Sequence, residues 1–441
     1  MTTTKHPQAS AVVVGGGIAG VACAKRLAEA DVTVTLVDKR NYQQFQPLLY
    51  QVASGMLGAA DVARPLRGLF RKQQTVFVKE AEVAKVDPTA KTVTTVDGST
   101  FSGDYLVLAM GAQPNFFDTP GAREHTFPLY SLEDAERLRS RIFQVLEDAD
   151  LYPDLVERGA LNFVVIGGGA TGVETAGALS DLVNEVLPDR FHDLAIDRAR
   201  IFVVDLGDAL LNGFSDKARA YASTALHERG VQVMLGCSAK EITPDRVVLN
   251  DGTHILTRTV VWAGGLKAAE LAANSGIVTS RGGRIDVESD LSVAGLPGVY
   301  AVGDVANFHG NDGKALPQLG SVALQAGAAA ARSILADLDG TPTPAFEYRD
   351  KGIMAMIGRR AAIAELGKRH REVHGRLAFL SWLAVHAWLL DGVQERIDAL
   401  FAWGWDYLSK NRATSVIDRP NAARIDWRAV DEGASAPIGG D

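Results

Sequence analysis

Two glycine clusters are the strongest chemical signals in this sequence. Residues 15–20 (GGGIAG) and 167–172 (GGGATG) both follow the pattern G-x-G-x-x-G, and they begin 152 residues apart. In such a loop the chain turns tightly, backbone N–H groups approach a pyrophosphate, and the next helix directs its positive end at the phosphate charge. Each cluster therefore predicts a phosphate-binding turn, and an ordinary glycine-rich loop is the alternative for a single cluster.

An acidic residue follows each cluster at a distance that suits ribose binding. Asp38 lies 23 residues after the start of the first cluster, where a carboxylate accepts hydrogen bonds from ribose hydroxyls. Asp205 lies 38 residues after the start of the second, and this longer spacing predicts an enlarged helix around residues 180–196. No Arg or Lys separates Asp205 from Asp208, so a 2′-phosphate would be repelled and NADH favoured over NADPH. The alternative for Asp205 is a solvated acid in a turn.

The elements that would position these residues repeat in the same order. An apolar β-branched run precedes each cluster, a helix is expected after it, and a second strand ends at each acid, as in a dinucleotide-binding βαβ unit. Short alternating strands with Asp-Gly turns, and then an apolar strand closed by glycine, follow both units. The sequence therefore predicts an α/β chain with two Rossmann-like dinucleotide-binding domains related by internal duplication.

Composition limits the class of protein. The 441 residues amount to about three domain lengths, and 47% hydrophobic with 22% charged residues indicate a globular protein. A net charge of −8 provides no overall basic field, so no nucleic-acid partner is expected. The first ten residues are polar and lack the pattern of a secretory signal, which predicts an unprocessed cytoplasmic chain.

The two cysteines exclude several kinds of chemistry. Cys23 and Cys237 are far apart in the sequence, so a disulfide framework, a cysteine-built metal site and a redox cysteine pair are excluded. Buried packing is expected for both thiols, and no metal site is expected.

Two dinucleotide sites in one chain indicate that one holds a flavin dinucleotide and the other a nicotinamide dinucleotide. Gly303 and Asp304 end a further short strand and resemble the FAD-binding signature of the two-dinucleotide-domain flavoproteins. In that family the carboxylate of the Gly-Asp pair holds the flavin ribityl chain. The resemblance therefore implies this contact for Asp304.

Four segments resemble the type II NADH:quinone oxidoreductases, the single-subunit NADH dehydrogenases that do not pump protons. They are residues 45–55 (FQPLLYQVASG), 167–177, 262–265 (WAGG) and 348–355 (YRDKGIMA), and the resemblance spans nearly the whole chain. It implies that a hydride passes from NADH to FAD and that two electrons then pass to a membrane quinone, menaquinone or ubiquinone. The cofactors would carry the hydride chemistry, so protein groups would act by position and charge.

The resemblance also implies three catalytic residues. The glutamate matching Glu174 lies at the nicotinamide and quinone side of the flavin, and the lysine matching Lys351 lies near the ring. Gln325 matches the second glutamine of a quinone-side A-Q-x-A-x-Q pattern, whereas Ser321 replaces the first. The shorter Ser321 side chain motivates an alternative, an FAD-dependent NADH reductase of a soluble or protein acceptor. A flavin-bound redox sensor with little turnover is the other alternative.

The motifs and the resemblance together imply a larger set of cofactor-binding residues. These residues are Gly15, Gly17, Ile18, Ala19, Gly20, Asp38, Lys39, Gln46, Pro47, Leu48, Val83, Ala109, Gly111, Gly167, Gly169, Ala170, Thr171, Gly172, Asp205, Gly264, Gly303, Asp304, Pro317 and Gln318. The expected domains are an FAD-binding domain (residues 1–115 and 276–344), an NADH-binding domain (residues 116–275) and a C-terminal region (residues 345–441).

The C-terminal region has the pattern of a membrane-surface element. Residues 377–390 carry no formal charge but are fewer than the about 20 needed to span a bilayer. Residues 347–376 hold eight Lys/Arg against four Asp/Glu. Amphipathic helices on an anionic lipid surface are predicted, and a buried dimerisation hairpin is the alternative. Apolar residues at helical spacing continue the pattern at Val393, Ile397, Leu400, Phe401, Gly404 and Leu408.

The resemblance favours peripheral attachment to the cytoplasmic face of the cell (inner) membrane, and a homodimer is compatible with it. His386 has no second histidine at a suitable spacing, so it is expected to be packed or interfacial and not itself a ligand.

Overall fold

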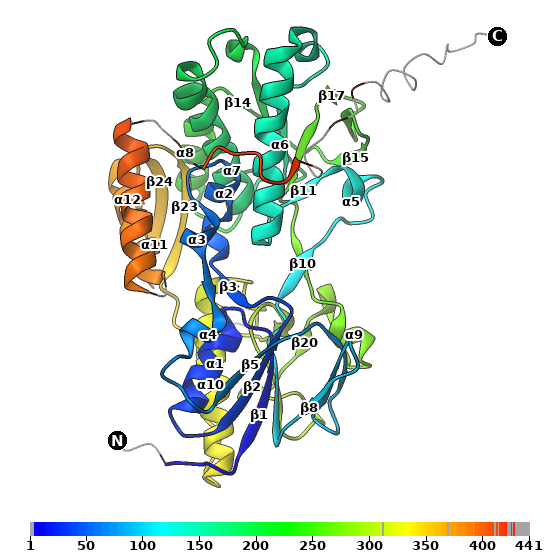
Figure 1. Ribbon diagram of the computed structural model, residues 1–441, viewed down its shortest axis with the longest axis vertical. Coiled ribbons are helices and arrows are strands. Elements are labelled where there is room, and N and C mark those ends of the chain that lie inside the picture. The colour runs from blue at the N-terminus through cyan, green and yellow to red at the C-terminus, as the bar shows by residue number, and fades with distance from the viewer. Residues whose placement is uncertain are drawn as a thin grey trace, which may run out of the picture. The chain divides into compact units, whose positions relative to one another are not determined.

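The computed structural model describes residues 4–310, 313–367, 370–390, 392–409, 412, 414–420, 425 and 427 (Figure 1). The chain forms two compact units. Unit 1 comprises Met1–Gln44, Ala63–Gln113 and Leu266–Asp350, and unit 2 comprises Phe45–Val62, Pro114–Gly265 and Lys351–Asp441. The side chains of Val393 and Leu408, which belong to the predicted apolar stripe, lie outside the described part.

A five-stranded parallel sheet forms the core of unit 1. Its order is β21-β9-β1-β2-β5, and its strands are nearly free of polar side chains at the centre because both faces are covered. After β1 the chain adds β2 and then β5 on one side of the sheet, and it then adds β9 and β21 on the other side. The change of side between β1 and β9 is the switch point where ligands bind in open α/β sheets. The strands are β1 (Ser10–Val14), β2 (Thr33–Asp38), β5 (Val76–Glu80), β9 (Tyr105–Leu108) and β21 (Val299–Ala301).

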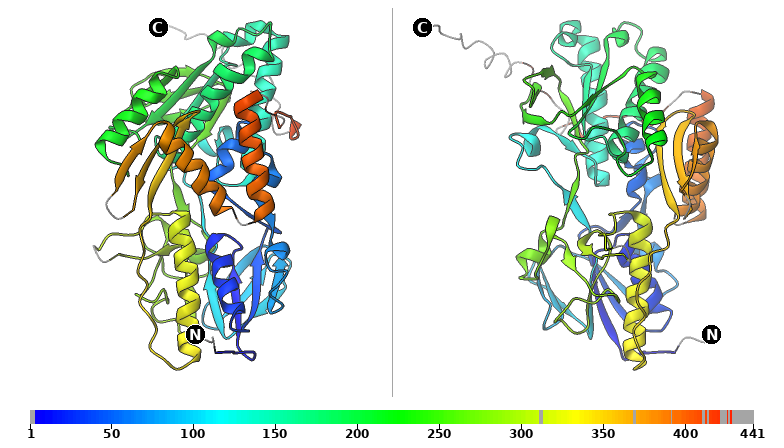
Figure 2. Two further views of the ribbon diagram at one scale, coloured as in Figure 1. Left: turned by 90° about the vertical axis from the view of Figure 1, so that its left-hand side faces the viewer. Right: turned by 180° about the vertical axis from the view of Figure 1, so that it is seen from behind.

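Two helices of unit 1 touch through small residues. Helix α1 (Ile18–Ala28) packs along α10 (Gly320–Leu338), the small-residue helix that the sequence predicts (Figure 2). A Cβ on Gly327 would lie 2.1 Å from the carbonyl oxygen of Ala19, so only glycine permits this approach. Cys23 is fully buried within α1, as expected.

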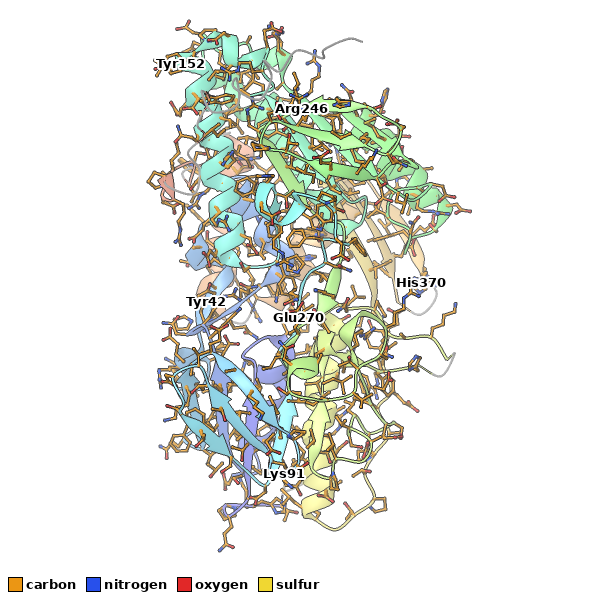
Figure 3. The ribbon with its side chains drawn as sticks, turned by 90° about the vertical axis from the view of Figure 1, so that its right-hand side faces the viewer. Tyr42, Lys91, Tyr152, Arg246, Glu270 and His370 are labelled. Atoms are coloured by element: carbon orange, nitrogen blue, oxygen red, sulfur yellow. The ribbon has the colours of Figure 1, made fainter. Side chains whose placement is uncertain are left out.

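Smaller elements complete unit 1. An antiparallel sheet of β6 (Val83–Asp87), β7 (Thr92–Thr95) and β8 (Thr100–Ser102) is inserted between β5 and β9, with Lys91 in its turn (Figure 3). The other elements are β3 (Tyr42–Gln44), β4 (Ala63–Pro65), α4 (Leu66–Leu69), α9 (Leu271–Asn274), β20 (Ile285–Asp286) and β22 (Ala306–Asn307). The two-stranded pair of β10 (Ala112–Pro114) and β19 (Leu266–Ala268) occurs where the chain passes from one unit to the other.

Unit 2 repeats the same sheet order. Its parallel sheet runs β11-β18-β12-β13-β14, and an antiparallel sheet of β15 (Ala239–Ile242), β16 (Arg246–Leu249) and β17 (His254–Leu256) is inserted between β14 and β18, as β6, β7 and β8 are inserted between β5 and β9 (Figure 3). The strands are β11 (Phe127–Pro128), β12 (Asn162–Ile166), β13 (Arg200–Asp205), β14 (Val231–Leu235) and β18 (Thr259–Trp262). The helices are α2 (Leu49–Ala53), α3 (Ala59–Val62), α5 (Ala122–His125), α6 (Leu132–Leu151), α7 (Ala170–Asp181) and α8 (Asp216–His227). The α/β class and its duplication are confirmed.

Two expectations for unit 2 are wrong. The spacing before Asp205 predicts one enlarged helix, but α7 ends at Asp181 and continues as a π-helix (Leu182–Val186) and a 3-10 turn (Leu187–Asp189). Pro188 lacks the N–H that a helix continuing past Leu187 would need, so the helical segment stops in the 3-10 turn. Cys237 is half-buried, because it follows the turn after β14 at the edge of the sheet.

The C-terminal part of unit 2 forms a small sheet and two helices. Strands β23 (Gly352–Gly358), β24 (Ala361–Leu366) and β25 (Arg371–His374) are antiparallel, with His370 before β25 (Figure 3). Helices α11 (Arg376–Leu389) and α12 (Val393–Ser409) pack against each other. Among the described residues, no helix combines the length and the apolar character needed to cross a bilayer.

Replacement of two helical glycines by alanine should have opposite effects on the stability of the fold. A Cβ on Gly177 in α7 would lie 2.0 Å from the carbonyl oxygen of Ile357 in β23, whereas one on Gly404 in α12 would meet no described atom within 4 Å. Gly177→Ala should therefore destabilise the fold by about 1–3 kcal/mol. Gly404→Ala should stabilise it by about 0.5–1 kcal/mol because alanine favours the helix. Urea unfolding measures both, and equal effects would contradict the close packing of α7 on β23.

Candidate active site

The first glycine loop is tightly packed at its first and last glycines and has free space at its middle one. Gly15 follows β1 with φ +106°, and a Cβ there would lie 2.2 Å from the carbonyl oxygen of Ala109 at the end of β9. A Cβ on Gly20 would lie 1.9 Å from the carbonyl oxygen of Gly15. At Gly17, in contrast, a Cβ would have none of the described atoms within 4 Å. The backbone thus forms a cradle with room for a phosphate over Gly17.

The second loop has the same geometry in unit 2. A Cβ on Gly167 would lie 2.3 Å from the carbonyl oxygen of Ala263, and one on Gly172 would lie 1.8 Å from that of Gly167. Gly169 again faces open space within the described structure. Gly264 follows Ala263 at the end of β18 and adjoins this switch point. Gly111, with φ +71°, adjoins the first switch point in the same way.

Both acids are held at their cradles by backbone N–H groups. Asp38 Oδ2 accepts from Gly16 N at 2.6 Å, and Oδ1 accepts from Arg40 N at 2.8 Å. Asp205 Oδ2 accepts from Gly168 N at 2.5 Å, and Oδ1 accepts from Gly207 N at 2.7 Å. A carboxylate has about four acceptor positions, so each acid retains capacity for ribose hydroxyls.

The helices that start at the cradles favour an anion. Ile18 and Ala19 begin α1, Ala170 and Thr171 begin α7, and neither helix has an acidic residue in its first turn. Helices of 11 and 12 residues direct a partial positive charge of about half an elementary charge at the loop. Open cradle, helix end and acid together match the donors and acceptors that a dinucleotide requires, and they occur once in each unit.

The Gly-Asp pair lies next to the first cradle. Gly303 has φ +72°, and its Cβ position would lie 3.1 Å from the Cβ of Ala19, so Gly303 and Asp304 adjoin the start of α1. Gln318 Nε2 donates to the backbone oxygen of Asp304 at 3.0 Å. Pro317 and Lys39 are exposed, and Val83 is half-buried at the start of β6.

Gln46, Pro47 and Leu48 belong to another unit than the first glycine loop, although both were expected in the FAD-binding domain. They form a 3-10 turn in unit 2, whereas the residues 15–20 loop belongs to unit 1. The Gln46 Oε1 atom is buried and accepts no hydrogen bond within the described ranges. An orphaned acceptor of this kind is uncommon and suits a ligand donor.

Glu174 is the buried carboxyl group of α7. It is 9% exposed, and its Oε1 accepts from the Met356 N–H of β23 at 3.1 Å. Burial raises the pKa of Glu174 to about 8, against smaller lowering effects of the Met356 N–H and the Trp382 indole N–H. The Trp382 indole N–H is itself buried and lacks a partner at normal hydrogen-bond geometry in the described structure. The site therefore holds a proton on Glu174 at neutral pH.

Lys351 is not brought to the Glu174 carboxyl. It is exposed immediately before β23, five residues from Met356, which is about 16 Å along a strand. Its Nζ lies 5.9 Å from the centroid of the Trp388 ring. Lys351 therefore faces α11 at the far end of the strand.

Gln325 holds the backbone of the following segment. Its Nε2 donates to the Arg349 oxygen at 3.1 Å, and its Oε1 accepts from the Arg349 N–H at 3.0 Å. One turn earlier, the Ser321 hydroxyl lies 2.9 Å from the Tyr348 hydroxyl. Ser321 and Tyr348 thus form a hydroxyl pair where the family pattern has its first glutamine.

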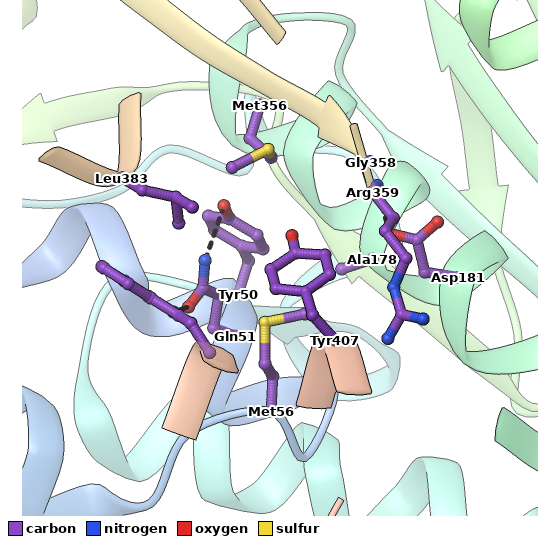
Figure 4. Close-up of a pocket in the computed structure, with 11 residues that line it drawn as sticks. Tyr50, Gln51, Met56, Ala178, Asp181, Met356, Gly358, Arg359, Leu383 and Tyr407 are labelled. Atoms are coloured by element: carbon purple, nitrogen blue, oxygen red, sulfur yellow. Dashed lines mark hydrogen bonds between the residues drawn. The ribbon is translucent and has the colours of Figure 1, made fainter. Parts of the chain in front are cut away.

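Several polar residues near Glu174 are missed by the sequence reasoning. Tyr50, Gln51, Asp181 and Tyr407 line a cavity in unit 2 (Figure 4). Asp181 lies seven residues after Glu174, on the same face of α7, and this spacing was the available signal. Tyr50 and Gln51 occur inside the residues 45–55 motif, but pairing them with residues more than 120 positions away requires the tertiary structure.

His386 is packed, as expected. Its ring stacks on Trp382 with centroids 3.8 Å apart, and burial lowers the pKa of His386 to about 4. The described residues contain no group of three or more His, Cys, Asp or Glu side chains placed to hold a metal ion.

The chain is similar to known flavoprotein reductases. Residues 9–327 match the family model described as pyridine nucleotide-disulphide oxidoreductase. The chain is 33% identical over 422 residues to the type II NADH:quinone oxidoreductase Ndh of Mycobacterium tuberculosis, covering 92% of this chain and 89% of that protein. It is 35% identical over 423 residues to NdhA of the same organism, also described as a type II NADH:quinone oxidoreductase, covering 92% and 88%.

A solved structure shares the fold. NDH2 of Plasmodium falciparum in complex with NADH superposes with a TM-score of 0.85 and 18% identity, covering 91% of this chain and 99% of that chain. At this identity the likeness concerns the fold alone.

The buried Glu174 predicts a pH-dependent stability. Between about pH 5 and 8 the folded state keeps a proton that the unfolded chain releases, because the unfolded pKa is about 4.3. Stability should therefore fall as pH rises through this window. Glu174→Gln removes the effect, so from pH 6 to 8 the unfolding free energy of the variant should gain about 2–3 kcal/mol relative to the wild type. Urea titrations at both pH values measure the unfolding free energies. The same change with pH in the variant and the wild type would contradict the raised pKa of Glu174.

Proposed function

The chain belongs to the type II NADH:quinone oxidoreductases within the pyridine nucleotide-disulphide oxidoreductase family, and from this premise we propose how its residues work. It is an FAD-dependent enzyme that oxidises NADH and reduces a quinone without pumping protons. The observation that carries the proposal is the repeated cradle, with one open glycine, one helix end and one acid in each unit. Two dinucleotides can thus be held by one chain.

The two cradles hold different cofactors. The loop at residues 15–20 binds FAD together with Asp38, Gly303, Asp304 and Gln318, within the FAD-binding domain of residues 1–115 and 276–344. The loop at residues 167–172 binds NADH together with Asp205 and Gly264, within residues 116–275. When bound, FAD accepts a hydride from NADH and passes two electrons to quinone. The protein's own task is to position the two dinucleotides and the quinone, and to supply protons.

Glu174 supplies a proton to the quinone. The reaction of NADH and quinone to NAD and quinol takes up one proton besides the hydride. Glu174 is buried and neutral near pH 7, which is the protonation state that a donor needs. This role goes beyond the position at the nicotinamide and quinone side of the flavin that the resemblance implies for Glu174.

Lys351 and the Ser321–Tyr348 pair serve the flavin and the acceptor. The exposed Lys351 ammonium provides positive charge for the reduced ring. Both polar atoms of the Gln325 amide already bond to the Arg349 backbone, so Gln325 acts by fixing this segment. When the Ser321 hydroxyl donates to the Tyr348 oxygen, Tyr348 keeps its own hydroxyl hydrogen for the acceptor.

The choice of acceptor tests this function. Turnover of NADH with a short-chain menaquinone or ubiquinone analogue should equal or exceed turnover with a soluble dye. Activity with the dye alone would favour the soluble-acceptor alternative. Slow bleaching of the flavin band by NADH in stopped flow would favour the redox sensor.

The C-terminal helices attach the enzyme to a membrane surface. Helix α11 exposes Leu377, Leu380 and Trp388, and α12 exposes Leu400 and Phe401, each between 51% and 72%. Trp382 on α11 and Trp403 on α12 are buried instead, so these two rings are not available to lipid. Exposed apolar and aromatic side chains beside a basic segment suit the headgroup region of an anionic bilayer. We further propose that the enzyme is a peripheral protein of the cytoplasmic face of the inner membrane and that it forms a homodimer.

A matched pair of substitutions tests the lipid contact. Phe401→Ser on α12 should reduce binding to vesicles of phosphatidylglycerol and phosphatidylcholine about tenfold or more, because a buried aromatic ring contributes about 1.5–3 kcal/mol. Phe77 is 51% exposed on β5 of unit 1, so Phe77→Ser is the control and should leave binding unchanged. Flotation of both variants with these vesicles measures the bound fraction. Equal binding by Phe401→Ser and the wild type would contradict this surface.

A further inference from the structure

A strained turn lies beside the second glycine loop of unit 2. Phe117 and Asp118 have positive φ angles of +49° and +56°, and the Thr119 N–H donates across them to the Phe116 oxygen at 2.9 Å. Two positive φ angles at the centre of a turn are typical of type I′, in which Gly, Asn and Asp predominate. A bulky residue such as Phe117 therefore adopts this conformation at a cost in free energy.

The two phenylalanines of this turn lie in different environments. The Phe116 ring packs on Trp262, with ring centroids 5.5 Å apart, and against the hydrophobic core of this part of unit 2. The Phe117 side chain is instead 62% exposed. Burial therefore offsets little of the backbone strain at Phe117. Strain of this kind is concentrated at functional sites, where contact with a ligand is the purpose of the unusual conformation.

Hydrogen bonds to the end of β18 hold the turn in place. The Asn115 N–H donates to the Gly265 oxygen at 3.0 Å, and the Trp262 indole N–H donates to the Asn115 backbone oxygen at 2.9 Å. The Asn115 side-chain oxygen accepts from the Phe117 N–H at 3.1 Å. The backbone thus fixes the position of the exposed ring.

The Phe117 ring and the second glycine loop adjoin the same short segment, residues 263–265. A Cβ on Gly265, which has φ +133°, would lie 3.5 Å from the Phe117 ring. Two residues earlier, the Ala263 oxygen would lie 2.3 Å from a Cβ on Gly167. Two residues of extended chain cover about 7 Å, so the ring is close to a ligand that lies on the loop.

The order of the strands decides which half of NADH meets this ring. The sheet runs β18-β12-β13, and the second glycine loop follows the middle strand, β12. Asp205 ends β13 and has the position of the acid that holds the adenosine ribose. The nicotinamide half then extends to the other side of the loop, where Gly264 and Gly265 follow β18.

We propose that the Phe117 ring contacts the nicotinamide half of NADH and holds it beside Gly265. The proposal rests on the function proposed above, because it takes NADH as the ligand of the second glycine loop. An aromatic ring provides a large apolar contact for a flat ring and its sugar. Phe117 thus acts by position, and no proton or electron passes through it.

The test compares NAD with ADP, which carries the same adenosine and pyrophosphate but lacks the nicotinamide half. Calorimetric titration of the full-length, FAD-loaded protein measures both affinities. Phe117→Ala should weaken NAD binding about tenfold, as expected for loss of one aromatic contact, and should leave ADP binding unchanged. Phe117→Tyr keeps the aromatic face and should retain most of the NAD affinity. Asp205→Asn, on the adenosine side, should weaken the binding of both ligands.

Two glycine substitutions separate ligand contact from the geometry of the turn. Asp118→Gly relieves a positive φ at the neighbouring position and removes no ring, so it should leave NAD affinity unchanged. Phe117→Gly removes both the ring and the strain. Without added NAD, its urea midpoint of unfolding should therefore exceed that of Phe117→Ala, although the two variants bind NAD equally weakly.

Failure of the proposed function is visible in the wild type by itself. A wild-type protein that binds neither NAD nor ADP would overturn that function together with this proposal. If the wild type binds NAD, an unchanged NAD affinity in Phe117→Ala would overturn the role of Phe117 alone. An equal loss of NAD and ADP affinity in Phe117→Ala would also overturn it, because the ring would then support the whole loop.

Discussion

The structure depends on close backbone contacts that only glycine permits. At Gly15 and Gly167 the chain passes so near the carbonyl of the adjacent central strand that any Cβ would overlap it. The same contacts place each helix start and each acid at the switch point of its sheet. Core packing and ligand binding therefore use the same atoms, so neither can be altered without the other.

A second constraint is the burial of charge around α7. Asp181, Arg359, Asp406 and Arg412 are shielded from solvent and paired with one another or with backbone groups. Removal of one partner from such a group leaves an uncompensated buried charge, which destabilises a protein strongly. The network thus ties α12 to the Rossmann-like part of unit 2 through polar contacts. The apolar side of α12 is left facing outward, where a lipid surface can cover it.

Local sequence patterns predicted the parts of the fold that local physics determines. The strand, glycine turn, helix and acid order is encoded within about 40 residues, and both copies formed as expected. The helix after Ala170 was predicted too long because residue spacing does not show that Pro188 interrupts the hydrogen-bond ladder. Residue type likewise does not distinguish the buried Trp382 and Trp403 from the exposed Trp388.

The sequence by itself determined the two phosphate cradles, their acids and the class of chemistry, because these depend on residues close together in the chain. Only the tertiary structure decided that Gln325 is occupied by the Arg349 backbone, that Lys351 lies away from Glu174, and that Glu174 is neutral. It also brought Tyr50, Asp181 and Tyr407 to one cavity. The physical reason is that burial and long-range contacts set protonation and hydrogen bonding, and neither is a property of a residue type or a spacing.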